Sequence, residues 1–273
     1  MITKITQDKP TRLFLILGGF FVANALIAEV IGVKIFSLEK TFGFAPLEIN
    51  VFGELLSLNL TAGVLLWPVV FIMTDLINEY YGQKGVRFLS FLAAGLIAYA
   101  FLMFYGAMEL EPAPFFVSSK VSTGVPDMEL AYESVLGQGG KIIIGSLVAF
   151  LLGQLIDVIA FHKIKQATGE KMIWLRATGS TFISQFIDSY VVLFIAFYLG
   201  SRIGAKEGDF VWSFKLFLAV GTVNYVYKAI VALALTPVIY LMHYLIERYL
   251  GPTTAMAMKK AAMNKENSLE AID

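Results

Sequence analysis

The sequence predicts an all-α polytopic membrane protein. Of its 273 residues 58% are hydrophobic and only 15% are charged, whereas about a quarter of the residues of a soluble domain are charged. The apolar residues gather in long runs of about 20 residues or more, the length that an α-helix needs to cross a bilayer. These runs are too long and too uniformly apolar for the strands of a membrane barrel.

Six apolar runs give six expected transmembrane helices. They cover residues 13–38, 62–81, 86–108, 142–161, 177–199 and 214–244. The first run is too long for a signal peptide, so we expect it to remain as a span. The last run should bend near Pro237, since proline interrupts a helix. The expected organisation is therefore a polar segment over 1–12, a six-helix transmembrane domain over 13–250 and a disordered tail over 251–273.

The charges between the runs predict the orientation. Lysine and arginine gather before the first run, in the 82–87 and 162–176 turns and after the last run, whereas the 39–54 and 109–133 segments carry mostly acids. Because positive loops remain inside, both termini are expected in the cytoplasm, and a bacterial protein of this kind would lie in the inner membrane. Within the long 109–141 loop, a short amphipathic helix is expected near 128–136.

Composition also excludes several functions. The chain has no cysteine and only two histidines, so a thiol nucleophile, a disulfide framework and a histidine-rich metal site are excluded. The formal net charge is zero, and nothing suggests nucleic-acid binding. No cofactor and no enzymatic activity are expected.

A repeated motif stands inside the fourth and fifth runs. Each copy has a small residue, a glutamine, two apolar residues and an aspartate, and the copies supply Gln154 with Asp157 and Gln185 with Asp188. A charge at the centre of a membrane helix costs about 2.5–3.5 kcal/mol even on the lenient insertion scale. Small residues recur every four positions before each aspartate, which allows helices to approach closely. Both aspartates should therefore face the interior of the bundle.

Other polar residues fall within the remaining runs. Glu29 lies in the first, Asp75 and Asn78 share one helical face in the second, and Asn224 and Lys228 share a face in the sixth. We interpret Glu79, near the end of the second run, as an interfacial carboxylate.

Four interior carboxylates thus accompany one lysine. Either some of these acids carry protons, or the cavity binds a cation or a strong hydrogen-bond donor, and both options describe a transporter. Lys228 and Asp188 should both lie near mid-membrane, and we expect them to form an ion pair. The alternative is that the amides and carboxylates only connect neighbouring helices.

The motifs together resemble the queuosine precursor transporter family, also grouped as putative vitamin uptake transporters. The matching residues are Asp75 within Thr-Asp-Leu-Ile-Asn-Glu-Tyr-Tyr-Gly, the motif ending at Asp157, Gly179-Ser180-Thr181 leading to Gln185 and Asp188, and Asn224-Tyr225 with Lys228. The resemblance covers the second to the sixth run. It implies a bacterial inner-membrane protein that imports the 7-deazaguanines preQ0 and preQ1 for tRNA modification.

The chemistry of such a substrate fits the interior residues. A guanine-like edge presents an N–H beside an NH2 group, which suits a carboxylate, and a carbonyl, which suits lysine, asparagine or glutamine. A second carboxylate would neutralise the aminomethyl cation of preQ1. Trp67, Phe71 and Tyr225 are candidates for stacking on the base, although each could equally pack in the core or face lipid. The candidates for substrate binding or coupling are Asp157, Asp188, Gln154, Gln185, Lys228, Asn224, Asp75, Asn78 and Glu29.

Three other functions stay open at this stage. A vitamin-binding subunit of a multi-component ATP-driven importer would need partner proteins, because the chain has no G-x-x-x-x-G-K-[ST] motif. An intramembrane aspartyl enzyme would use Asp157 and Asp188, but the Gly-x-Gly-Asp motif of such proteases is absent. A structural scaffold would tolerate neutral residues at the carboxylates. Energy source and oligomeric state do not follow from the sequence.

Overall fold

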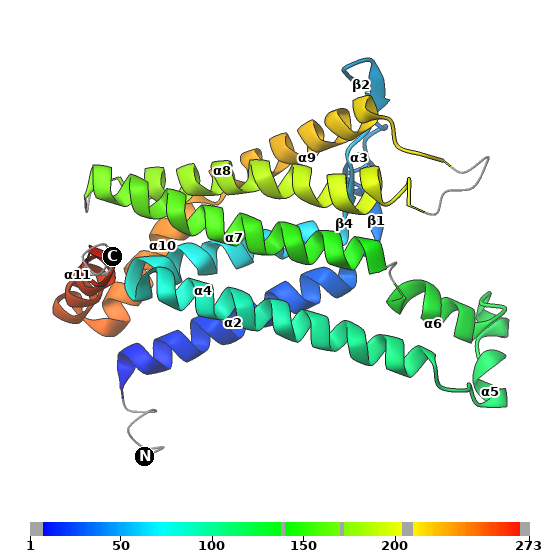
Figure 1. The fold of residues 1–273 in the computed structure, drawn as a ribbon, viewed down its shortest axis with the longest axis horizontal. Helices are drawn as coiled ribbons and strands as arrows, with labels where there is room; N and C mark the ends of the chain where they lie inside the picture. The colour runs from blue at the N-terminus through cyan, green and yellow to red at the C-terminus, as the bar shows by residue number, and fades with distance from the viewer. Residues whose placement is uncertain (1–7, 138–139, 170–171, 204–209, 268–273) are drawn as a thin grey trace.

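A computed structural model describes residues 8–137, 140–169, 172–203 and 210–267 as a bundle of long helices (Figure 1). The main helices are α2 (Lys9–Ile31), α4 (Trp67–Met108), α7 (Gly140–Thr168), α8 (Ile173–Leu193), α9 (Phe214–Ala234), α10 (Thr236–Leu250) and α11 (Pro252–Asn267). The start of α2 and helix α11 lie at one end of the bundle, and the short strands and α6 (Met128–Leu136) lie at the other (Figure 1).

Five helices of the described residues are long and apolar enough to cross a membrane: α2, α4, α7, α8 with its π-helical continuation η3 (Phe194–Leu199), and α9. This agrees with the predicted class of helical polytopic membrane protein. The predicted runs 62–81 and 86–108 both fall in α4, preceded by the short 3-10 helix η1 (Ala62–Leu65). Gly82 interrupts α4 with a φ of 71°, which glycine adopts without strain, and beyond it the chain runs back in the opposite direction (Figure 1).

The predicted sixth span is divided. Helix α9 ends at Ala234, α10 begins at Thr236, and Pro237 lies in the first turn of α10. Proline is tolerated there because the amide that it lacks has no partner within the helix. The expected bend near Pro237 is thus confirmed, but a single helix over 214–244 is wrong.

The disorder that we expected over 251–273 is also wrong for most of that segment. Pro252–Asn267 form α11, whose Ala255, Lys259 and Ala262 are buried. The helix packs against α4 at its turn, where a Cβ added to Gly82 would lie 3.3 Å from the carbonyl oxygen of Ala262. These contacts order a segment that is too polar to be recognised by hydropathy.

The segment between the first two apolar runs contains strands that the all-α prediction did not include. Helix α2 ends at Ile31, seven residues before the predicted end of the first run at 38. The strand β1 (Ile35–Ser37) and the short helix α3 (Leu38–Thr41) follow it. Strand β1 pairs with β4 (Asn59–Thr61), and β2 (Ile49–Val51) pairs with β3 (Glu54–Leu56), both antiparallel.

In the 109–141 loop, the structure contains α5 (Pro114–Val117), the 3-10 helix η2 (Val121–Thr123) and α6. Helix α6 spans Met128–Leu136, as predicted, and the side chain of Asp127 caps it by accepting a hydrogen bond from the Leu130 amide at 2.9 Å.

Helices α7 and α8 lie side by side along most of their length (Figure 1). A Cβ added to Gly145 would lie 3.1 Å from the backbone nitrogen of Ala196, and one added to Gly153 would lie 3.4 Å from Cβ of Asp188. Glycine at these positions therefore sets how closely the two helices approach. The predicted role of the small residues is confirmed, and Asp157 and Ser184 are buried in this contact.

Candidate functional site

A cavity of about 470 Å³ lies in the half of the bundle that carries the strands and α6. Cavities that bind small molecules have volumes of about 300–1,000 Å³. Helices α2, α7, α8 and α9 contribute to its wall, and Ile35, Leu60 and Ser134 line it toward the strand end. Four predicted site residues line this outer cavity: Glu29, Asp188, Asn224 and Lys228.

Lys228 and Asp188 form the ion pair expected from the sequence. The Lys228 ammonium lies 2.5 Å from Oδ2 of Asp188, and each side chain is 20% exposed. The pair connects α9 to α8. Because both side chains keep some contact with the cavity, a polar ligand can reach their charges without unfolding any helix.

A second, smaller space of about 40 Å³ lies beside the outer cavity. Asp75 and Gln185 line it together with apolar residues of α4 and α9, and Lys228, Trp67 and Val64 line both spaces. We call this space the inner pocket. Lys228 therefore stands in the wall between the outer cavity and the inner pocket.

Two polar side chains of the inner pocket, Asp75 and Gln185, carry atoms without partners among the described residues. Asp75 is 1% exposed and Gln185 is 2% exposed. Within the described parts of the chain, Oδ1 of Asp75 and both side-chain amide atoms of Gln185 have no hydrogen bond. Buried polar groups are nearly always hydrogen-bonded, so unpartnered atoms on a pocket wall indicate a place for a polar ligand or water.

The remaining predicted residues lie deeper and line neither space. Oδ1 of Asp157 accepts a hydrogen bond from the Ser184 hydroxyl at 3.0 Å, and Oε1 of Gln154 accepts one from the Thr74 hydroxyl at 3.0 Å. Asn78 is buried on the same helix as Asp75. The structure thus brings Asp188, Asp75 and Gln185 to cavity walls, and it places Asp157, Gln154 and Asn78 between helices.

The aromatic candidates are divided in the same way. Trp67 lines both spaces and Phe71 lines the inner pocket, and their ring centroids are 6.4 Å apart. Tyr225 instead packs edge-on against Phe186 with a centroid distance of 5.4 Å and lines neither space. Tyr227, which the sequence analysis did not single out, lines the inner pocket.

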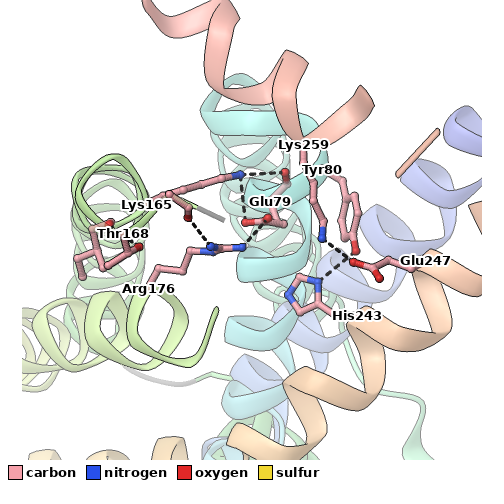
Figure 2. Close-up of polar contacts among 10 residues, drawn as sticks. Glu79, Tyr80, Lys165, Thr168, Arg176, His243, Glu247 and Lys259 are labelled. Atoms are coloured by element: carbon pink, nitrogen blue, oxygen red, sulfur yellow. Dashed lines mark hydrogen bonds and ion pairs between the residues drawn. The ribbon is translucent and has the colours of Figure 1, made fainter. Parts of the chain in front are cut away.

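Sequence reasoning missed a buried charge cluster toward the α11 end of the bundle. Glu79 is fully buried, with Arg176 Nη2 2.7 Å from its Oε1 and Lys165 Nζ 3.1 Å from its Oε2 (Figure 2). The interpretation of Glu79 as an interfacial carboxylate is therefore wrong. The sequence did show a basic turn over 162–176, but pairing it with Glu79 requires knowing that α4, α7 and α8 meet there.

Further polar contacts surround this cluster. The Tyr80 hydroxyl lies 3.1 Å from Nδ1 of His243, and Lys259 of α11 lies 2.5 Å from Glu247 of α10 (Figure 2). These contacts join α4, α10 and α11. Together with the Glu79 cluster they fill the end of the bundle opposite the outer cavity. Among the described residues, no group of three or more His, Asp or Glu side chains could hold a metal ion.

Long apolar helices around a polar cavity define the class of protein: a polytopic membrane protein whose interior can accept a small polar molecule. Residues 61–242 match the family model described as "Putative vitamin uptake transporter". The chain belongs to this family, and it is therefore a transporter-family protein with several membrane-spanning helices.

Three curated relatives are similar to parts of the chain. The "Probable queuosine precursor transporter" of Bacillus subtilis (strain 168) is 30% identical over 56% of this chain, and that of Haemophilus influenzae (strain ATCC 51907 / DSM 11121 / KW20 / Rd) is 26% identical over 60%. The chain covers 63% and 65% of those two proteins. The "Queuosine precursor transporter" of Escherichia coli (strain K12) is 26% identical over 80% of this chain and 84% of its own length. No solved structure matches the chain.

Proposed function

We propose that this protein imports 7-deazaguanine precursors of queuosine, preQ0 or preQ1, across the bacterial inner membrane for tRNA modification. The observation that carries the proposal is the outer cavity lined by Glu29, Asp188, Asn224 and Lys228 in the interior of a transporter-family bundle. The names of the relatives supply the substrate class.

The proposed topology has six spans with both termini in the cytoplasm. Helix α4 supplies two of these spans, one on either side of Gly82. The α11 end of the bundle carries basic residues of the N-terminal, 82–87 and 162–176 segments, whereas the strands and α6 carry acids, which favours the α11 end as cytoplasmic. The outer cavity then faces the periplasm, and the Glu79 cluster closes the cytoplasmic side.

The cavity chemistry suits a base of this kind. Carboxylates accept hydrogen bonds from an exocyclic amine and a ring N–H, and lysine or amide groups donate to a carbonyl. Carboxylates also neutralise a substrate cation. Asp157 and Gln154 would act indirectly, since their hydrogen bonds to Ser184 and Thr74 join α7 to α8 and α4 beside the cavity.

Two of the three alternative functions receive less support from the contacts of the aspartates and from the single chain. An aspartyl enzyme needs two carboxylates that share a proton, but Asp188 pairs with Lys228 and Asp157 accepts from Ser184. A binding subunit of an ATP-driven importer would bind the same substrate but would need partners to transport it.

A rescue experiment tests the proposal. A bacterium that can neither make nor import queuosine precursors receives the gene and low external preQ0 or preQ1, and queuosine is measured in its tRNA. The wild type should restore queuosine, Asp188→Asn should not, and Glu133→Gln, at an exposed carboxylate of α6, should behave as wild type. Membrane levels are checked by immunoblot for each.

Absence of rescue by a wild-type protein that is present in the membrane would contradict the proposal. Binding of preQ1 by that purified protein would then identify a subunit that needs partners, and absence of binding would exclude this substrate class.

A further inference from the structure

We propose that the inner pocket binds the hydrogen-bonding edge of the base, and that Asp75 accepts hydrogen bonds from the ring N–H and the exocyclic amine of that edge. Gln185 and the Lys228 ammonium would meet its carbonyl. This inference rests on the proposed function and assigns separate roles to the interior carboxylates.

The first argument is the lack of partners on the pocket wall. Asp75 and Gln185 are 1% and 2% exposed, and Oδ1, Nε2 and Oε1 of these two side chains have no hydrogen bond among the described residues. A buried polar atom without a partner destabilises the protein. The same atoms would be satisfied by a ligand with donors and an acceptor on one edge.

The second argument is size. A space of about 40 Å³ holds about three water molecules. The edge of a guanine-like base carries three polar groups: an amine, an N–H and a carbonyl. That edge can therefore replace the water of the inner pocket, while the rest of the base and its substituent remain in the outer cavity of about 470 Å³.

The third argument is that the two spaces adjoin. Lys228, Trp67 and Val64 belong to both walls, so a flat ligand that reached from one space into the other would pass the Lys228 side chain and the indole of Trp67. Glu29 and Asp188 remain in the outer cavity. They are placed to neutralise a cationic substituent on the part of the base that does not enter the inner pocket.

This division predicts which bases are rejected. A carboxylate only accepts hydrogen bonds. Adenine-like bases present a ring nitrogen acceptor where a guanine-like base presents an N–H. The Asp75 carboxylate and this nitrogen would then both be acceptors, and no hydrogen bond could form between them. A hypoxanthine-like base keeps the N–H but lacks the amine, and it should lose one charge-assisted hydrogen bond.

The test combines a change in the ligand with a change in the protein. Purified full-length protein in nanodiscs is titrated with preQ1 and with its analogue lacking the exocyclic amine, using calorimetry. The wild type should bind the analogue about tenfold or more weakly, as expected for loss of a hydrogen bond to a charged group. Asp75→Asn should bind the two ligands within about threefold of each other, since its amide cannot accept from both donors.

Ser90→Ala is the matched control, because Ser90 is likewise buried on α4, beyond Gly82, and lines neither space. It should keep the full discrimination of the wild type. If Asp75→Asn does not fold, Gln185→Met gives an independent test with an analogue that lacks the carbonyl. The wild type should bind that analogue more weakly than preQ1, and Gln185→Met should reduce this difference without abolishing it, since the Lys228 ammonium still meets the carbonyl.

Discrimination of the amine that persists in Asp75→Asn, or a wild type that binds preQ1 and the amine-free analogue equally well, would overturn this inference while leaving the import function intact. A folded wild type that binds none of these bases would instead contradict the proposed function itself.

Discussion

The Lys228 ammonium and Asp188 Oδ2 are 2.5 Å apart, and this contact lies in the wall that separates the outer cavity from the inner pocket. Among the ion pairs of the described residues, this is the one whose two members both line a cavity. A charged ligand that competes for either member would change the balance of the pair.

Removing one member of this pair should destabilise the protein more than removing both. Lys228→Met leaves the Asp188 carboxylate without its cation and should cost about 1–3 kcal/mol of unfolding free energy, whereas Lys228→Met/Asp188→Asn should recover most of that loss. The unfolding temperatures of the wild type, the single variant and the double variant in detergent measure this order of stability. Equal losses in the single and double variants would show that the pair is not coupled.

The Glu79 cluster should tolerate substitution even less, because all three side chains are almost fully buried. Lys165→Met removes one of the two cations that contact Glu79, and Glu79→Gln removes the carboxylate that both cations contact. Each should cost about 3–5 kcal/mol and reduce accumulation in the membrane.

Lys163→Met is the matched control for Lys165→Met, since Lys163 is exposed on the same helix. It should behave as wild type in membrane level and unfolding temperature. If the two lysine variants were equally stable, the buried contacts of Lys165 would contribute nothing.

The contact between α7 and α8 should be sensitive to a single methyl group. Gly145→Ala would place Cβ 3.1 Å from the backbone nitrogen of Ala196, and a backbone atom cannot move aside as a flexible side chain can. The overpacking should cost about 1–3 kcal/mol. Unfolding temperature and transport should both fall.

Gly95→Ala provides the comparison, because a Cβ there meets nothing within 4 Å. In a helix interior alanine is favoured over glycine by about 1 kcal/mol, so this variant should be as stable as wild type or more stable. A Gly145→Ala variant that gained stability like Gly95→Ala would mean that the helices can separate without cost.

The sequence predicted the long helices well because hydropathy over about 20 residues depends little on tertiary contacts. The repeated motif also predicted correctly that Asp157 and Asp188 face the interior of the bundle, one buried and one on the cavity wall, since the period of the small residues determines the face of the helix. The burial of residues near the helix ends was harder to predict. Glu79 lies near the end of an apolar run, as a boundary residue does, and its burial depends on the contact with Arg176 of another helix.

The division of the site into two spaces could not be predicted, since it depends on which side chains of five helices meet. Helix α11 was missed for a different reason. Ala255, Lys259 and Ala262 recur at helical spacing, and alanine and lysine favour helices, but the segment is polar and short and we judged it by hydropathy alone.

The last prediction concerns pH and lies outside the membrane. Glu39 accepts hydrogen bonds from the Leu58 amide at 2.6 Å and from the Ser37 hydroxyl at 2.9 Å. Chiefly the hydrogen bond from the Leu58 amide lowers the pKa of this carboxyl below its usual value. A carboxyl whose pKa is lower in the folded state stabilises the fold above its unfolded pKa, and this stabilisation is lost as the pH falls through the folded pKa.

Glu39→Gln should therefore unfold at a lower temperature than wild type at pH 7, and the difference should shrink as the pH falls below about 4.5. Thermal unfolding of both proteins between pH 7 and pH 3.5 measures it. Glu48→Gln, at a neighbouring exposed carboxylate, serves as the control and should follow wild type at every pH. A difference between wild type and Glu39→Gln that stayed constant across this range would show that the Glu39 charge does not hold the 34–61 segment in place.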